Sequence, residues 1–207
     1  RDTYTLAPVA LNVEEKTRRV VQTIGDLVDD DLSKLSILDL GSHEGGFSLE
    51  LGAHGARVVG VEVRADNFAR AEFARQQLGL DNVSFHRADV RTLDPESWGQ
   101  YDVVICLGLL YHLDCEDVAR LIDRMHAVAG RMVIIDTHFA LEPTEWFEFE
   151  GKRYHGTSFR EHEDDVSSQD MEQAGWASIG NIHSFWFTKQ SLINRMMDAG
   201  FSSVLMS

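Results

Sequence analysis

Five short apolar and β-branched runs, separated by helical patterns, constrain the fold of this sequence more than any other feature. The runs are residues 36–40, 57–62, 83–85, 101–106 and 131–136. Strands that alternate with helices are typical of a parallel sheet that is buried on both faces. Because the crossover connections are right-handed, helices should cover both faces. We therefore expect an α/β fold with a doubly wound, mostly parallel sheet.

The expected helices follow from apolar periodicity and from their end signals. The first is an amphipathic helix within an N-terminal segment, residues 1–35, that we interpret as a lid. Near the other end, Thr188 is a candidate N-cap for a helix that runs to Ala199, and Gly200 is its stop signal. We expect a sixth strand over residues 201–206. The lid helix is expected at residues 13–28. Three further helices are expected between it and the C-terminal helix, at residues 46–53, 66–78 and 115–128.

Residues 139–187 break this alternation and are far longer than an ordinary connection. Six aromatic side chains between Trp146 and Trp176 argue against disorder. We therefore expect an ordered insertion that covers a substrate. With it, the chain forms a single domain, residues 1–207, made of the lid, a ligand-binding core at 36–138, the insertion, and a C-terminal helix and strand at 188–207.

The charge of the chain argues against nucleic acid as a partner. Nineteen basic and 34 acidic residues give a net charge of −15, which disfavours attraction to phosphates. A small-molecule substrate fits better. Cys106 and Cys115 show neither disulfide nor zinc spacing, so we expect a reducing, cytoplasmic location. No run of apolar residues is long enough to cross a membrane, and the first residues are not a secretory signal. The sequence lacks an initiator Met, which leaves a removed leader open.

The first expected strand leads through a glycine-containing loop into a helix. Asp39 ends the strand, and Gly41, Ser42 and Gly45 follow it. Glycines let a ligand approach the backbone, and the helix N-terminus offers unpaired amide groups. A dinucleotide site would have glycine where His43 stands. The carboxylate of Asp39, beside the loop, would also repel a pyrophosphate but attract an ammonium group. Turn formation and helix capping are the structural alternatives.

Two more acidic residues close the second and third strands. Glu62 could accept hydrogen bonds from both hydroxyls of a ribose. Asp89 could bind an adenine amino group, with Val63 and Val90 on either side of the ring. Each could instead be an ordinary strand-end or core residue. Three acidic strand ends in this order are nevertheless stronger evidence than a single glycine loop.

These motifs resemble the Rossmann-like S-adenosylmethionine-dependent methyltransferases over residues 36–136. The resemblance includes the segment that begins with Leu107 after the fourth strand, which in that family lies beside the methyl donor. It implies S-adenosylmethionine as the cofactor and an enzyme of the methyltransferase class. It also implies a final antiparallel hairpin, whereas this sequence stops after one expected strand. The implied cofactor contacts are Asp39, Gly41, Ser42, Gly45, Glu62, Val63, Asp89, Val90 and Leu107.

Residues that follow the fourth and fifth strands are candidates for the acceptor side. His112 and His138 are the candidate general bases, and a helix-start role is the alternative for His112. Irregular spacing of the His and acidic residues in the insertion predicts no metal site. The candidate acceptor-binding residues are Tyr111, Tyr154, His155, Arg160 and Trp186.

We expect methyl transfer to an oxygen or nitrogen of a small molecule, with the biosynthesis of a specialised metabolite as its setting. Residues 108–112 also resemble the tRNA uridine carboxymethyltransferases, which use a carboxylated donor. We identify no cationic partner for such a donor in the core motifs, and the acidic charge counts against tRNA. A donor-binding regulatory subunit without turnover is the alternative that is not an enzyme. The sequence predicts no oligomeric state.

Overall fold

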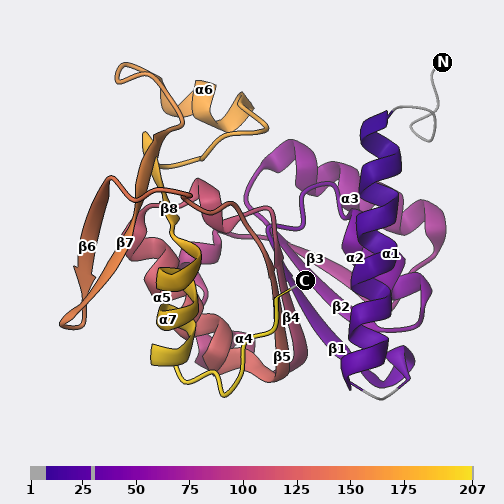
Figure 1. Ribbon diagram of the computed structural model, residues 1–207. Coiled ribbons are helices and arrows are strands. Elements are labelled where there is room, and N and C mark those ends of the chain that lie inside the picture. The colour runs from indigo at the N-terminus through magenta and orange to yellow at the C-terminus, as the bar shows by residue number, and fades with distance from the viewer. Residues whose placement is uncertain (1–7, 29–30, 207) are drawn as a thin grey trace. The chain divides into compact units, whose positions relative to one another are not determined.

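A five-stranded sheet in the order β3-β2-β1-β4-β5 organises the chain (Figure 1). The structure, a computed structural model, describes residues 8–28 and 31–206, with side chains from residue 14 onward. Strand β1 pairs in parallel with β2 and β4, and β2 pairs in parallel with β3. This confirms the predicted α/β fold. The strands are β1 Ser36–Leu40, β2 Arg57–Glu62, β3 Val83–Arg87, β4 Tyr101–Leu107 and β5 Ala129–Asp136.

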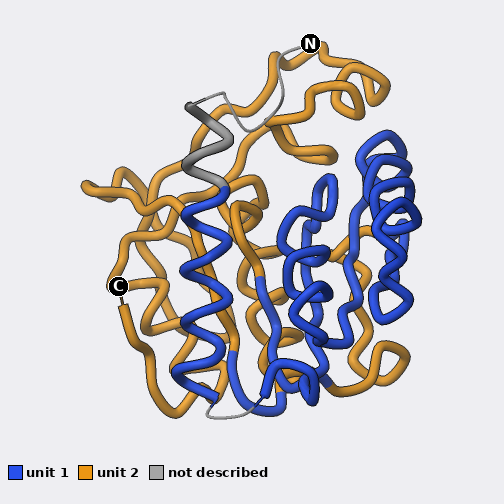
Figure 2. The backbone as a smooth tube through the Cα atoms, turned by 90° about the vertical axis from the view of Figure 1, so that its right-hand side faces the viewer, with its two compact units in different colours: residues 1–88, 101–105, 130–132 blue, residues 89–100, 106–129, 133–207 orange. Residues whose placement is uncertain are grey.

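The chain divides into two compact units, coloured separately in Figure 2. The first comprises residues 1–88, 101–105 and 130–132, and the second comprises residues 89–100, 106–129 and 133–207. Strands β4 and β5 therefore contribute residues to both units. Among the described residues, no helix combines the length and the apolar character that crossing a bilayer requires.

The first unit contains β1, β2, β3, the first three α-helices and one short 3-10 helix. All five residues of β1 are buried, as its apolar sequence predicts. The long helix α1 turns Val20 and Ile24 inward, whereas Arg18 pairs with Glu14 on an exposed face. Residues 1–7 and 29–30 of the expected lid lie outside the described residues, so its function stays a prediction. The helices are α1 Pro8–Val28, the short η2 Leu32–Lys34, α2 Gly46–Ala53 and α3 Ala65–Leu78.

The second unit contains a three-stranded antiparallel sheet, β6-β7-β8, that the sequence interpretation missed. Its first two strands form a hairpin through Glu150 and Gly151, both of which have positive φ. Glu-Gly is a weaker hairpin signal than Asn-Gly or Asp-Gly, although this backbone suits a two-residue turn. The strands are β6 Glu145–Phe149, β7 Lys152–Arg160 and β8 His183–Phe187. The helices are η3 Val90–Thr92, α4 Pro95–Trp98, η4 Leu110–His112, α5 Cys115–Val128, α6 Ser168–Gln173 and α7 Lys189–Asp198.

One face of the β6-β7-β8 sheet forms the aromatic core of the second unit. Phe147, Phe185 and Phe187 lie within 5.2–5.5 Å of one another, measured between ring centroids. Tyr154 joins them and is only 2% exposed, while its hydroxyl donates to Asp198. The strand alternation places the next residue of β7, His155, on the opposite, exposed face.

The C-terminal part of the fold confirms one prediction and corrects another. Thr188 caps α7, and its hydroxyl oxygen accepts a hydrogen bond from the Ser191 amide. The strand expected at residues 201–206 does not form. Leu205 is 77% exposed, and no described strand pairs with this segment. Because this segment does not pair with a sheet edge, its backbone is not satisfied as a strand.

Candidate functional site

The loop after β1 has a backbone that requires glycine. Gly41 and Gly45 have φ angles of 74° and 83°, and His43 lies between them at 52°. At Gly45, an added Cβ would lie 2.7 Å from Cζ of Phe85, so internal packing also demands glycine there. The amides of Gly41 and Ser42 both donate to the Val61 carbonyl at 2.9 Å. These contacts support the turn role of the two glycines, and their ligand role remains a prediction.

Asp39 is a buried carboxyl group at the end of β1. Its Oδ2 accepts a hydrogen bond of 2.6 Å from the hydroxyl of Ser48, which lies in the first turn of α2. Burial raises the pKa of Asp39 to about 7; the hydrogen bond from Ser48 opposes this rise, and the charge of Glu62 adds to it. The contact with Ser48 ties Asp39 to the first turn of α2, so a structural role at this helix start stays an alternative to ligand binding. A bound cation would favour the ionised carboxylate, so the site also fits an ammonium group.

Glu62 presents a fixed carboxylate at the end of β2. Its Oε2 accepts from the His43 amide at 2.9 Å, and its Oε1 accepts from the Arg64 amide at 2.7 Å. Each oxygen retains a second lone pair, which suits the two hydroxyls of a ribose. Nearby in the loop, the Ser42 hydroxyl is buried and lacks a hydrogen-bond partner among the described residues. A bound ligand could satisfy this group.

Asp89, the candidate adenine contact, is already hydrogen-bonded within the protein. Both oxygens of Asp89 accept from the Arg91 guanidinium, at distances down to 2.6 Å. Burial alone would raise the pKa of Asp89, but the hydrogen bonds and charge of Arg91 lower it below the usual value. An adenine amino group would therefore compete with Arg91 for the Asp89 carboxylate. The sequence interpretation did not identify this pairing. Val90 is buried, whereas Val63 and Leu107 are half-buried.

In the second unit, η4 brings His112 to a buried carboxylate. The His112 Nδ1 atom lies 3.1 Å from both Oε1 and Oε2 of Glu161, whose side chain is 3% exposed. The carboxylate also accepts from the Ser184 hydroxyl at 2.8 Å and from the Ser178 amide at 3.2 Å. Burial would raise the pKa of Glu161, but the hydrogen bonds from His112 and Ser184 lower it. Glu161 is 49 residues from His112, so no local pattern could have identified it.

Aromatic side chains surround the same short helix. The Tyr111 ring stacks on His138 with centroids 4.0 Å apart and an interplanar angle of 9°. Trp186 donates from its indole nitrogen to the Tyr111 carbonyl at 3.0 Å, and its ring stacks on Phe159. Tyr111 also lies against His112, with centroids 4.3 Å apart. The structure therefore brings together both predicted bases and two predicted acceptor residues, Tyr111 and Trp186.

The three other acceptor candidates do not join this group. The buried ring of Tyr154 does not face an open surface, and burial and Asp198 raise its pKa to about 12. Direct acceptor binding by Tyr154 therefore disagrees with its packing. The imidazole of His155 is exposed, but its backbone is held by Ser191 and Thr188.

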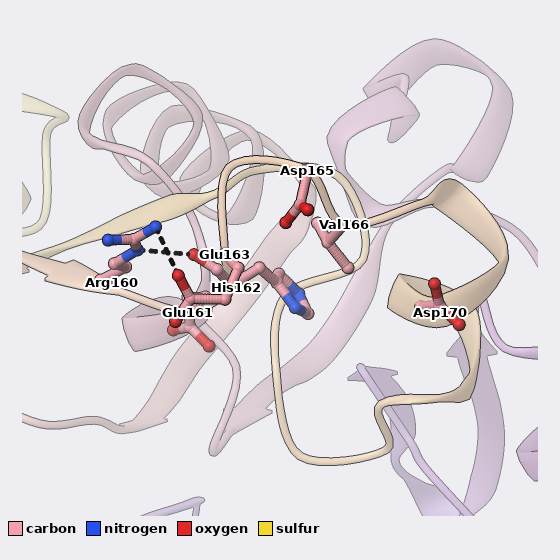
Figure 3. Close-up of a pocket in the computed structure, with 7 residues that line it drawn as sticks. All are labelled: Arg160, Glu161, His162, Glu163, Asp165, Val166 and Asp170. Carbon is pink, nitrogen blue, oxygen red and sulfur yellow. Dashed lines mark hydrogen bonds and ion pairs between the residues drawn. The ribbon is translucent and has the colours of Figure 1, made fainter.

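Arg160 lines an open cavity of about 610 Å³ and pairs there with Glu163 at 2.8 Å (Figure 3). It also pairs with Asp164 at 3.2 Å. Within the described residues, no three His, Cys, Asp or Glu side chains are arranged to hold a metal ion. The cavity is lined by Arg160, Glu161, His162, Glu163, Asp165, Val166 and Asp170.

Known methyltransferases are similar to this chain in sequence and in fold. A family model for a methyltransferase domain matches residues 37–130, which include the β1 to β4 strand ends. The N-terminal domain of EvdMO1 with bound SAH gives a TM-score of 0.70 at 25% identity, over 92% of this chain and 72% of that chain. Both findings support a Rossmann-like S-adenosylmethionine-dependent methyltransferase. The predicted recognition is thereby confirmed.

Other methyltransferases are similar over a shorter length. The magnesium protoporphyrin IX methyltransferase ChlM from Synechocystis PCC 6803 with bound SAM has a TM-score of 0.56 and 26% identity, over 69% of this chain and 65% of that chain. Magnesium-protoporphyrin O-methyltransferase from Synechocystis sp. is 30% identical over 60% of this chain and 56% of its own length. Ubiquinone biosynthesis O-methyltransferase from Acinetobacter baumannii is 29% identical over 40% of this chain and 35% of its own. The chain thus spans only about a third to just over half of these two curated relatives.

Proposed function

We propose that this chain transfers a methyl group from S-adenosylmethionine to an oxygen atom of a small molecule. The observation that carries the proposal is the His112–Glu161 pair beside the aromatic rings of Tyr111, His138 and Trp186. An imidazole whose Nδ1 is bound to a carboxylate is a suitable general base. The names of two curated relatives, both O-methyltransferases, also support oxygen as the acceptor atom.

On the donor side, Asp39 and Glu62 would bind and orient the ligand. Asp39 would pair with its ammonium group, and Glu62 would accept from its ribose hydroxyls. When bound, S-adenosylmethionine supplies an electrophilic methyl group on a sulfonium. The protein's task is then to hold the acceptor in line with that methyl group and to exclude water.

On the acceptor side, the second unit would receive a small molecule. Nε2 of His112 would take the proton of an acceptor hydroxyl, and the stacked Tyr111 and His138 rings would contact an apolar or aromatic body. We assign acceptor specificity to residues 139–187, which supply Phe159 and Trp186 to this group. A cytoplasmic setting and a role in specialised metabolism remain predictions from the sequence.

Donor binding and methyl transfer, measured separately, test this proposal. We expect Asp39→Ala and Glu62→Ala each to weaken donor binding at least about tenfold, because each loses a charged hydrogen bond worth about 1.5–3 kcal/mol. Calorimetric titration measures the affinity, and Asp81→Ala, which removes an exposed carboxylate of the first unit, is the control. Unchanged affinity in both site variants would reject the donor-site assignment.

A transfer assay identifies the acceptor class. A radiolabelled methyl donor is incubated with the protein and with metabolite fractions, tRNA or protein. Label in a base-stable methyl ether, formed from an alcohol or a phenol, supports O-methylation of a small molecule. Label in tRNA would favour the tRNA-modifying alternative, and donor binding with no transfer would favour a regulatory subunit.

A further inference from the structure

We propose that Glu161 is a positioning residue that fixes His112 as a base directed at hydroxyl acceptors. The inference rests on the proposed methyl transfer and adds a residue that neither the loop motifs nor the family match identifies. No motif in this sequence marks Glu161, which directly follows β7; only the fold places its carboxylate against the imidazole.

The contact geometry restricts the imidazole. Nδ1 of His112 is equidistant, at 3.1 Å, from the two oxygens of Glu161. A carboxylate only accepts hydrogen bonds, so Nδ1 must carry the proton that it donates. The lone pair of the neutral ring then lies on Nε2. No hydrogen bond to Nε2 of His112 is present within residues 8–28 and 31–206, and the side chain remains 20% exposed.

Glu161 is itself held by hydrogen-bond donors from two buried residues. Ser184, which is 1% exposed, donates its hydroxyl to Oε1, and the amide of Ser178 donates to Oε2. The same part of the chain also holds η4, because the Asn181 side chain donates to the His112 carbonyl at 3.0 Å. The Phe185 amide donates to the Leu113 carbonyl at 2.9 Å. The imidazole and its carboxylate are thus fixed through both backbone and side chain.

The chemistry of the acceptor follows from this arrangement. A hydroxyl keeps its proton until the oxygen attacks, so its methylation gains from a base at that moment. As the new oxygen–carbon bond forms and the carbon–sulfur bond breaks, the hydroxyl proton passes to Nε2 of His112. Glu161 stabilises the resulting imidazolium without taking the proton itself. An amine that arrives neutral does not need this step before it attacks.

The tautomer of His112 provides a test that does not depend on activity. Nitrogen NMR of the labelled full chain, at a pH where the imidazole signals show the neutral ring, distinguishes a proton on Nδ1 from one on Nε2. We expect Nδ1–H in the unaltered protein. In Glu161→Gln the carboxamide presents one oxygen and one NH₂ group to Nδ1 in place of two acceptors, so the preference for Nδ1–H should weaken and the population of Nε2–H should rise. An unchanged tautomer in Glu161→Gln would overturn the proposal.

Kinetics provide the second test. We expect Glu161→Gln to lower kcat about 10²–10⁴-fold, as loss of general-base catalysis does, with little change in donor affinity. Glu161→Asp should recover part of the rate because it restores an anionic acceptor. The matched control is Glu96→Gln, which alters an exposed carboxylate in α4, outside the segment assigned to the acceptor.

A double-mutant cycle separates positioning from mere stabilisation. If Glu161 acts through His112, adding Glu161→Gln to His112→Ala should cost nothing further in kcat. An additive loss would overturn the proposal, and so would an equal fall in donor affinity in Glu161→Gln. If the unaltered protein binds donor but methylates no hydroxyl, the proposed function fails. The tautomer measurement would still decide whether Glu161 sets the imidazole.

Discussion

At the scale of single residues, Asp39 combines complete burial with an ionisable side chain. Its carboxyl group contacts Ser48 and lies close enough to Glu62 to be affected by that charge. Both effects of its surroundings, burial and a neighbouring anion, disfavour ionisation, and a bound cation would reverse this preference. The charge state of Asp39 should therefore govern what the end of β1 binds.

Donor affinity should consequently depend on pH. The pKa of Asp39 is raised to about 7, so below this value the residue is neutral and cannot pair with an ammonium group. We expect donor affinity to rise up to about tenfold per pH unit from about pH 5.5 to 6.5 and to level off above about pH 7. Calorimetric titrations across this range measure the slope. Asp39→Asn should show weak binding without it, and a slope that persists in Asp39→Asn would contradict the assignment.

The same pKa predicts the stability of the ligand-free protein. Between about pH 4 and pH 7, native Asp39 retains a proton that the unfolded chain has released. Stability from this residue is therefore fully present at low pH and is lost as the pH rises through about 7. Over that pH interval, we expect the free energy of unfolding to fall less for Asp39→Asn than for the unaltered protein. Denaturation profiles at several pH values measure this difference.

At the scale of elements, the junction between β1 and α2 depends on a glycine. Gly45 is the N-cap residue of α2, has left-handed backbone angles and faces Phe85. Gly79, which ends α3, is also left-handed but has no atom within 4 Å of an added Cβ. The two positions differ in packing and share their backbone requirement, so together they separate strain from steric overlap.

Alanine at each glycine should reveal this difference. Gly79→Ala should lower the free energy of unfolding by about 1–2 kcal/mol, the cost of a left-handed non-glycine residue. Gly45→Ala should cost about 1–3 kcal/mol more, because its Cβ would lie 2.7 Å from Phe85 and force repacking. Urea denaturation measures both. Equal losses would show that Phe85 yields easily and that packing does not explain Gly45.

At the scale of the whole molecule, the chain carries a net charge of −15. Such a charge repels a polyanion, although a local basic patch can oppose the average. Two arginines are paired with nearby acids: Arg91 with Asp89 and Arg160 with Glu163. The charge balance therefore favours a small acceptor over tRNA.

Binding to tRNA should accordingly be weak. We expect no saturable binding at about 150 mM salt, where electrostatic attraction between exposed charges acts over only about 8 Å. Filter binding or fluorescence anisotropy with unmodified tRNA measures this, and a basic tRNA-binding protein serves as the positive control. Tight binding that weakens steeply with added salt would instead support the tRNA-modifying alternative.

The sequence alone determined the parallel sheet and its helices, because those elements follow from local periodicity and end signals. Helices α2 and α5 match the predicted limits, and Thr188 caps α7 as its position suggested. The acidic strand ends were also visible, since each lies at or just after a run that predicts a strand. Such features need only neighbouring residues to define them.

Only the tertiary structure decided which side chains meet in the second unit. The β6-β7-β8 sheet has a weak turn signal and depends on long-range pairing, so local patterns did not reveal it. That sheet buries Tyr154 and brings Glu161 to His112 across 49 residues of sequence. The strand expected at residues 201–206 failed for the complementary reason: strand propensity has no effect without a partner. Partners are chosen by the packing of the whole chain, and spacing along the sequence does not encode that choice locally.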